Sequence, residues 1–246
     1  MLLARFITQP QERSRGLRGL PRRAFIMSAV LMVLVPSALA HSLKELEQSL
    51  LEKEKFFQPA DSEAPGFSLQ DADGRIVRLT DFKGKVVVLH FIYTNCPDVC
   101  PLHAEKIVEI QKMVNITPMK GEVEFISITT DPKRDKGQVL RDFGANHGLD
   151  PANWMFLTAA PDEPETVTRD LAKAYGVEFK AMDDGHLMHG VLTSVIDQEG
   201  HLRGRFHSLE FQPLNLVIFV NALINKIQYE HHHEEPGFWA WLKEMF

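Results

Sequence analysis

Residues 86–101 read VVVLHFIYTNCPDVCP, and this stretch decides the fold. Its first half, Val86 to Tyr93, is almost entirely apolar and rich in β-branched and aromatic residues, which is typical of a strand buried on both faces. The segment after it has helical periodicity, and Pro101 suits the first turn of a helix. We therefore predict a buried strand, a short loop and a helix, with Cys96 and Cys100 at the junction.

Outward from this junction, strand-like and helix-like patterns alternate along the chain. The segment FSLQDADGRIVRL before it predicts a hairpin around Asp71–Gly74. After it, apolar runs predict further strands at 122–130, 154–159, 191–196 and 201–206. Helical patterns are found at 138–146, at 163–175 and from Pro213 onward. This order predicts one α/β domain over residues 63–228, with a central mixed sheet flanked by helices and an N-terminal hairpin extension.

The two ends of the chain differ from this domain in composition. Residues 1–23 carry six arginines and one glutamate, and an uncharged run at 24–40 ends in Ala-Leu-Ala. This pattern predicts a secretory signal peptide or an N-terminal anchor over residues 1–40. Residues 41–62 predict an amphipathic stalk or linker. Residues 229–246 form a tail rich in histidine and aromatic side chains, which either folds back or contacts a partner or a membrane.

Charge and location follow from these segments. The whole chain of 246 residues has a formal charge of -6, which argues against nucleic-acid binding, since that requires a basic surface. Without the arginine-rich leader the charge becomes about -11. We expect a periplasmic protein, either soluble after signal cleavage or tethered to the inner membrane by its N-terminal segment.

Cys96 and Cys100 are the only cysteines in the chain. A structural disulfide between them would close a very short loop and constrain the unfolded chain little. A dithiol redox centre usually has two residues between its cysteines, whereas three are found here. The third alternative is a soft-metal site that a histidine completes. The helix N-terminus is expected to lower the thiol pKa values in each case.

The string YTNCPDVCP, followed by ISITTDPKRD and by a Trp154-containing segment that ends in FLTAA, resembles the Sco/SenC family of copper chaperones. The resemblance covers about Pro65 to Ile227 and implies a thioredoxin-like fold. It also implies that Cys96, Cys100 and His189 bind copper as Cu(I) or Cu(II), with the two cysteines as a redox pair. Two thiolates and one imidazole suit three-coordinate Cu(I).

The match at the histidine is incomplete. Family members usually carry Asp before this histidine and Ser or Thr after it, whereas this chain has Met188 and Gly190. His186 is therefore a rival to His189 as the third ligand. Met182 and Met188 are soft donors in the same segment, although methionines more often fill gaps in packing.

The resemblance implies a metallochaperone rather than an enzyme. Such a protein would deliver copper to the copper centre of cytochrome c oxidase subunit II, or reduce the cysteines of that centre, during assembly. The implied partners are subunit II or another copper acceptor, a thioredoxin-like reductant and other copper chaperones. A reductant is expected because exported thiols oxidise. The alternatives are a thiol-disulfide oxidoreductase that uses Cys96 and Cys100, and a copper or redox sensor.

Several other residues have a chemical and a structural interpretation. Asp98 and Asp131 could orient ligands, or simply cap a helix and form a turn. His90 lies in the middle of the predicted central strand and is interpreted as a core residue. The tract His231–His233 could collect metal ions loosely, and His41 could chelate copper if it becomes the N-terminal residue.

Overall fold

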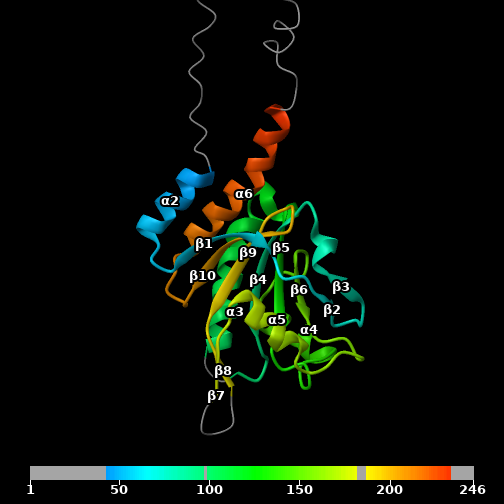
Figure 1. Cartoon of the computed structure of the whole chain (residues 1–246). Coiled ribbons are helices and arrows are strands. Elements are labelled where there is room, and N and C mark those ends of the chain that lie inside the picture. The colour runs from blue at the N-terminus through cyan, green and yellow to red at the C-terminus, as the bar shows by residue number, and fades with distance from the viewer. Residues whose placement is uncertain (1–42, 97–98, 182–186, 234–246) are drawn as a thin grey trace, which may run out of the picture. The chain divides into compact units, whose positions relative to one another are not determined.

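The computed structural model describes residues 43–96, 99–181 and 187–233. A six-stranded mixed sheet with the order β1-β10-β9-β4-β5-β6 forms its centre (Figure 1). Its strands are β1 (Phe57–Glu63), β10 (His201–His207), β9 (Leu192–Ile196), β4 (Val86–Ile92), β5 (Val123–Thr129) and β6 (Trp154–Leu157). Strand β4 runs parallel to β5 and antiparallel to β9.

The predicted buried strand is confirmed as β4, in which every residue is buried. Helices cover both of its faces, which explains why its sequence shows no alternation of polar and apolar residues. One face packs against α3 (Val99–Asn115), α4 (Gln138–His147) and α6 (Pro213–His233). The other face packs against α5 (Val167–Tyr175) and the hairpin of β2 (Ser68–Gln70) and β3 (Ile76–Arg78) (Figure 1).

The hairpin predicted around Asp71–Gly74 is confirmed, and the Asp71 side chain organises its turn. One carboxylate oxygen of Asp71 accepts hydrogen bonds from the amides of Asp73 and Arg75 at 2.8 and 2.9 Å. Gly74 adopts a positive φ of 81°, a conformation that most other residues avoid. Two short 3₁₀ helices, η1 (Leu79–Phe82) and η2 (Pro118–Gly121), each precede a strand.

Part of the segment interpreted as a stalk or linker belongs to the domain. Its first half forms the expected amphipathic helix, α2 (Leu43–Lys53), and Leu50 of this helix is buried in the core. The following residues form the edge strand β1, which pairs antiparallel with β10. Arg203 of β10 holds both elements, because its guanidinium lies 3.8 Å from Glu47 of α2 and 2.6 Å from Asp61 of β1.

The ends of the chain are outside this description. The predicted signal or anchor at 1–40, the residue His41 and the tail from 234 onward lie outside the described residues. His231–His233 are described only as the last backbone turn of α6. Among the described helices, none combines the length and the apolar character that crossing a membrane requires.

Gly204 of β10 is expected to tolerate no larger side chain. A Cβ atom at this position would lie 2.8 Å from ring carbons of both Phe57 and Phe219. Gly204→Ala should therefore lower the free energy of unfolding by about 1–3 kcal/mol, as overpacking of a tight core usually does. Urea denaturation measures this loss. Gly66→Ala is the matched control, because no atom lies within 4 Å of a Cβ there, and equal stability of the two variants would contradict the prediction.

Candidate metal and thiol site

Cys96 and Cys100 lie at the junction between β4 and α3. The chain leaves β4 at Ile92, and Cys100 lies in the first turn of α3. Neither cysteine forms a disulfide in the structure, and both are buried, with 8% of Cys96 and 1% of Cys100 exposed. The two side chains are joined by a hydrogen bond. The structure therefore brings the two predicted thiol ligands into direct contact.

The expectation of a lowered thiol pKa is wrong for Cys100. Its burial raises the pKa of this thiol far above the ordinary value, and the hydrogen bond with Cys96 and the nearby charge of Asp135 raise the pKa further. A hydrogen bond with the Tyr93 backbone lowers it by less. Desolvation of the thiolate thus outweighs the favourable helix N-terminus. Without metal, Cys100 is a neutral thiol, and a metal ion must displace its proton.

Tyr93 is a third member of this site, and the sequence patterns did not predict it. Burial and a hydrogen bond with the Cys96 side chain together raise the pKa of its phenol to about 12. The phenol therefore stays protonated at neutral pH and can donate its proton to the sulfur of Cys96. A donor to a metal-bound thiolate lowers the electron density on sulfur, which is one way in which a protein tunes a metal site.

A buried carboxylate holds the loop that carries Cys96. Asp135 is fully buried, and its oxygens accept hydrogen bonds from the Thr94 amide at 3.0 Å, the Thr94 hydroxyl and the Thr129 hydroxyl at 2.5 Å. Thr94 lies two residues before Cys96, and Thr129 is the last residue of β5. Asp135 thereby ties the cysteine loop to the end of the neighbouring strand.

The structure does not place Asp131 as a group that orients a ligand. Its carboxylate forms an ion pair with Arg134, and its amide donates a hydrogen bond to the Thr129 hydroxyl at 2.9 Å. This arrangement favours the turn-forming interpretation. Asp98, the other candidate for that role, lies outside the described residues.

His189 is described by its backbone position. It is the last residue of β8 (Leu187–His189), which pairs with β7 (Phe179–Ala181) so that His189 lies opposite Phe179. The sequence did not predict this small hairpin. After His189, the Gly190 amide donates to the Glu178 carbonyl at 3.0 Å, and the chain enters β9 beside β4.

The third ligand therefore stays a prediction. Within the described part of the chain, no three His, Cys, Asp or Glu side chains are arranged to hold a metal ion. His186 and Met182 lie outside the described residues, and Met188 is placed in β8 by its backbone alone. The two buried thiols supply the soft donors that copper prefers.

His90 is confirmed as a core residue. It is completely buried in β4, and its Nε2 lies 3.0 Å from the hydroxyl of Ser127. Burial lowers the pKa of the imidazole to about 3. The ring is therefore neutral at every pH at which the protein is expected to work.

This buried imidazole should make stability depend on pH. In the unfolded chain His90 takes up a proton below about pH 6.5, whereas in the folded chain it does so only below about pH 3. The contribution of neutral His90 to the free energy of unfolding is thus complete above about pH 6.5. It is lost as the pH falls, by up to about 1.4 kcal/mol per pH unit. Between pH 7 and 5, wild type should lose more unfolding free energy in urea than His90→Gln. Equal losses of unfolding free energy in the two proteins would contradict the lowered pKa of His90 in the folded chain.

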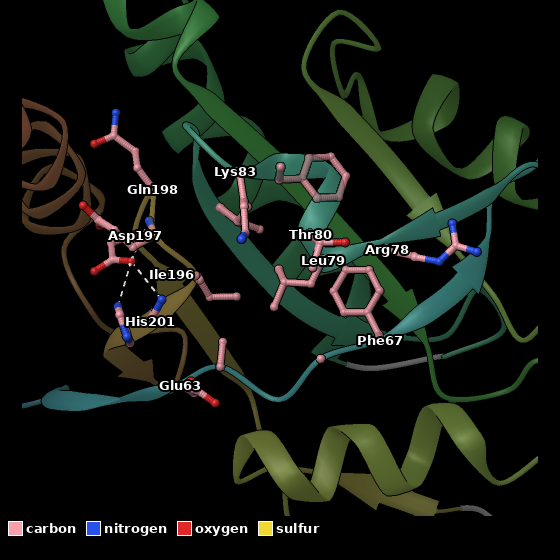
Figure 2. A pocket seen from close by; sticks show the side chains of 16 residues that line it. Glu63, Phe67, Arg78, Leu79, Thr80, Lys83, Ile196, Asp197, Gln198 and His201 are labelled. Carbon is pink, nitrogen blue, oxygen red and sulfur yellow. Dashed lines mark hydrogen bonds and ion pairs between the residues drawn. The ribbon is translucent and has the colours of Figure 1, made fainter.

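A pocket of about 280 Å³ lies away from the thiols, near the beginning of β4 (Figure 2). Residues of η1 and of the β9–β10 turn line it, and neither cysteine is among them. In that turn the Asp197 carboxylate accepts a hydrogen bond from the His201 amide at 2.8 Å. The lining mixes acidic, basic and apolar side chains, and we assign the pocket no function.

Two buried thiols at the junction of a buried central strand and the next helix are typical of a thioredoxin-like dithiol protein. The family model described as SCO1/SenC matches residues 57–223. The SCO1 protein homolog of Bacillus subtilis is 29% identical over 161 residues, which are 65% of this chain and 81% of that protein. The chain belongs to the SCO1/SenC family.

Solved structures agree with this assignment. One is of BsSco, described as a member of the Sco family of cytochrome c oxidase assembly proteins. It has a TM-score of 0.60 and 26% identity, covering 68% of this chain and 96% of that one. Another is Bradyrhizobium japonicum ScoI with copper bound, which has a TM-score of 0.54 and 26% identity over 66% and 99% of the two chains. The predicted thioredoxin-like fold is confirmed.

Proposed function

We propose that this protein binds copper through Cys96, Cys100 and His189 and supplies it to a copper centre during assembly of cytochrome c oxidase. The observation that carries the proposal is the hydrogen-bonded pair of buried cysteine thiols at the β4–α3 junction. Two relatives described above support it, one solved with copper bound and one described as an oxidase assembly protein.

The chemistry of this site favours copper as cargo. Two thiolates and an imidazole satisfy Cu(I), and a further ligand would allow Cu(II). Binding releases the thiol protons, and that of Cys100 is held tightly because the thiolate is desolvated. Copper affinity should therefore rise with pH, since metal and protons compete for the same sulfur. Because protons compete with copper for the sulfur, a lower pH favours release of the metal.

The location and the partners belong to the same proposal. The arginine-rich leader supports export to the periplasm, with or without a membrane tether. In that oxidising compartment the thiols need a reductant, for which a thioredoxin-like protein has the right chemistry. The proposed acceptor is oxidase subunit II, and other copper chaperones are candidate donors.

A second candidate function rests on the contact between the two thiols. Cys96 and Cys100 could reduce a disulfide of the acceptor: the acceptor gains two electrons and two protons, and the pair becomes a disulfide. Both functions use the same sulfurs, and His189 distinguishes them. The proposed copper site includes an imidazole ligand, whereas disulfide exchange between thiols requires none.

His189→Ala is therefore expected to weaken copper binding strongly and to remove the sulfur-to-copper charge-transfer absorption of the Cu(II) form. The variant should keep a disulfide that forms and is reduced normally. His201→Ala is the control, because His201 lies on β10 beside Asp197 and outside the proposed site. Unchanged copper binding in His189→Ala would contradict the ligand assignment. Full oxidase assembly in cells with this variant alone would favour the reductase.

A further inference from the structure

A row of buried polar side chains crosses the sheet beneath α3. In the strand register, His90 of β4 lies opposite Thr193 of β9 on one side and opposite Ser127 of β5 on the other. His103 of α3 lies over this row, with its ring centroid 4.8 Å from that of His90. All four side chains are at most 1% exposed. Polar groups at such depth are costly unless they are hydrogen-bonded.

The row contains two separate hydrogen-bonded links. Nε2 of His103 lies 2.9 Å from the hydroxyl of Thr193, which joins α3 to β9. Nε2 of His90 lies 3.0 Å from the hydroxyl of Ser127, and this hydroxyl accepts a hydrogen bond from Nε1 of Trp154 at 3.0 Å. This second link joins β4, β5 and β6. The two links are equally buried but connect different elements.

The link between His103 and Thr193 joins the two segments that carry the proposed ligands. His103 follows Cys100 by three residues, about one helical turn, so both lie on the same face of α3. Thr193 follows His189 by four residues and lies near the beginning of β9. The hydrogen bond between His90 and Ser127 joins neither segment, although the His90 ring packs against His103 and His90 pairs with Thr193 in the sheet.

We propose that His103 is a positioning residue of the metal site. Through its hydrogen bond with Thr193, it fixes the position of the helix that carries Cys100 relative to the strand that follows His189. The proposal rests on the proposed function. The sequence contains a signal for it, because His103 stands at a core position of a helix and the next core residues, Ala104, Ile107 and Val108, are apolar.

The bond suits this role because a buried hydrogen bond is directional. Removing one partner leaves the other unsatisfied in the core, which costs more than the bond itself contributes. The neighbouring elements then shift to regain a partner or admit water. A small shift of α3 against β9 would change the distance between the thiols and the imidazole, and metal ligands tolerate little such change.

The test compares both partners of the link with a control of equal burial. His103→Leu and Thr193→Val each remove the link, and Thr193→Val changes the volume little. His103→Gln and Thr193→Ser each retain a group that can form it. Ser127→Ala removes the other link in the same core. Copper affinity is measured by competition with a chelator, and the charge-transfer band of the Cu(II) form is recorded.

We expect His103→Leu and Thr193→Val to weaken copper binding about tenfold and to shift the charge-transfer band. His103→Gln and Thr193→Ser should keep the copper affinity and the charge-transfer band close to those of wild type. Ser127→Ala should lose stability but keep the affinity and the band of wild type. An equal loss of affinity in Ser127→Ala, or none in the first two variants, would overturn the positioning role.

A second readout needs no copper and separates this role from the proposed function. Hydrogen exchange of the reduced, metal-free protein reports on the amides of Gly190 and Leu192. Exchange at both should be faster in His103→Leu and Thr193→Val than in wild type and Ser127→Ala. If wild type binds no copper through its cysteines, the proposed function fails, and this exchange pattern still supports the link. Unchanged exchange at both amides would overturn the link.

Discussion

Cys100→Ser is expected to lower copper affinity by more than about 100-fold, beyond what changes outside the ligand shell usually cost. A serine hydroxyl is a hard donor that stays protonated, so it cannot replace a thiolate on Cu(I). Cys96→Ser should have the same effect, because the two sulfurs lie in contact. The sulfur-to-copper charge-transfer absorption should weaken in each variant and disappear in the double variant.

Chelator competition on reduced protein measures this loss, and urea denaturation shows whether the variants still fold. In Cys100→Ser the introduced hydroxyl would be buried like the thiol it replaces, and the Tyr93 backbone offers it a hydrogen bond. We therefore expect a folded protein. A Cys100→Ser protein with wild-type affinity and absorption would exclude Cys100 as a ligand.

Asp135→Ala should cause the largest loss of stability, about 3 kcal/mol or more. The substitution leaves the hydroxyl of buried Thr129 and the amide and hydroxyl of half-buried Thr94 without their acceptor. Hydrogen bonds to charged groups contribute about 1.5–3 kcal/mol each, and a buried donor left without an acceptor adds its desolvation cost. Asp135→Asn should lose less, because its amide oxygen can still accept.

The measurement is urea denaturation of the reduced protein, followed by chelator competition on the variants that fold. Copper affinity should fall as well, since Asp135 holds the loop that leads to Cys96. Asp170→Ala is the control: Asp170 pairs with Lys173 on the exposed surface of α5, where such pairs contribute little. Equal losses in Asp135→Ala and Asp170→Ala would contradict the role of the buried carboxylate.

The sequence predicts the centre of the fold well because local patterns and burial agree there. Strand β4 is a continuous apolar run, α3 has helical periodicity, and Gly148 and Gly176 end their helices in the left-handed conformation. These features are set by neighbouring residues, so they can be read without knowledge of the tertiary structure.

The missed elements have weaker local signals. Strand β1 reads FQPADSE, and six of its seven residues are at least partly exposed, so it has no apolar alternation. Pairing with β10 and the ion pairs of Arg203 hold it in place. Strands β7 and β8 have three residues each. Tertiary contacts determine such edge elements, and a single sequence does not display them.

The site was predicted in part for the same reason. The adjacent cysteines follow from the motif and its position between strand and helix. Three other features depend on burial and on residues that meet only in the folded chain. They are the high pKa of Cys100, the contact of Tyr93 with Cys96 and the hydrogen bonds from the cysteine loop to Asp135. The helix N-terminus is visible in the sequence, whereas the desolvation that outweighs it is not.

X-ray absorption spectroscopy of the reduced protein loaded with one equivalent of copper tests the central claim most directly. The proposed site predicts two sulfur neighbours and one imidazole nitrogen around copper, with the imidazole signal absent in His189→Ala. Copper surrounded only by nitrogen and oxygen would contradict the account, because Cys96 and Cys100 would then not be its ligands.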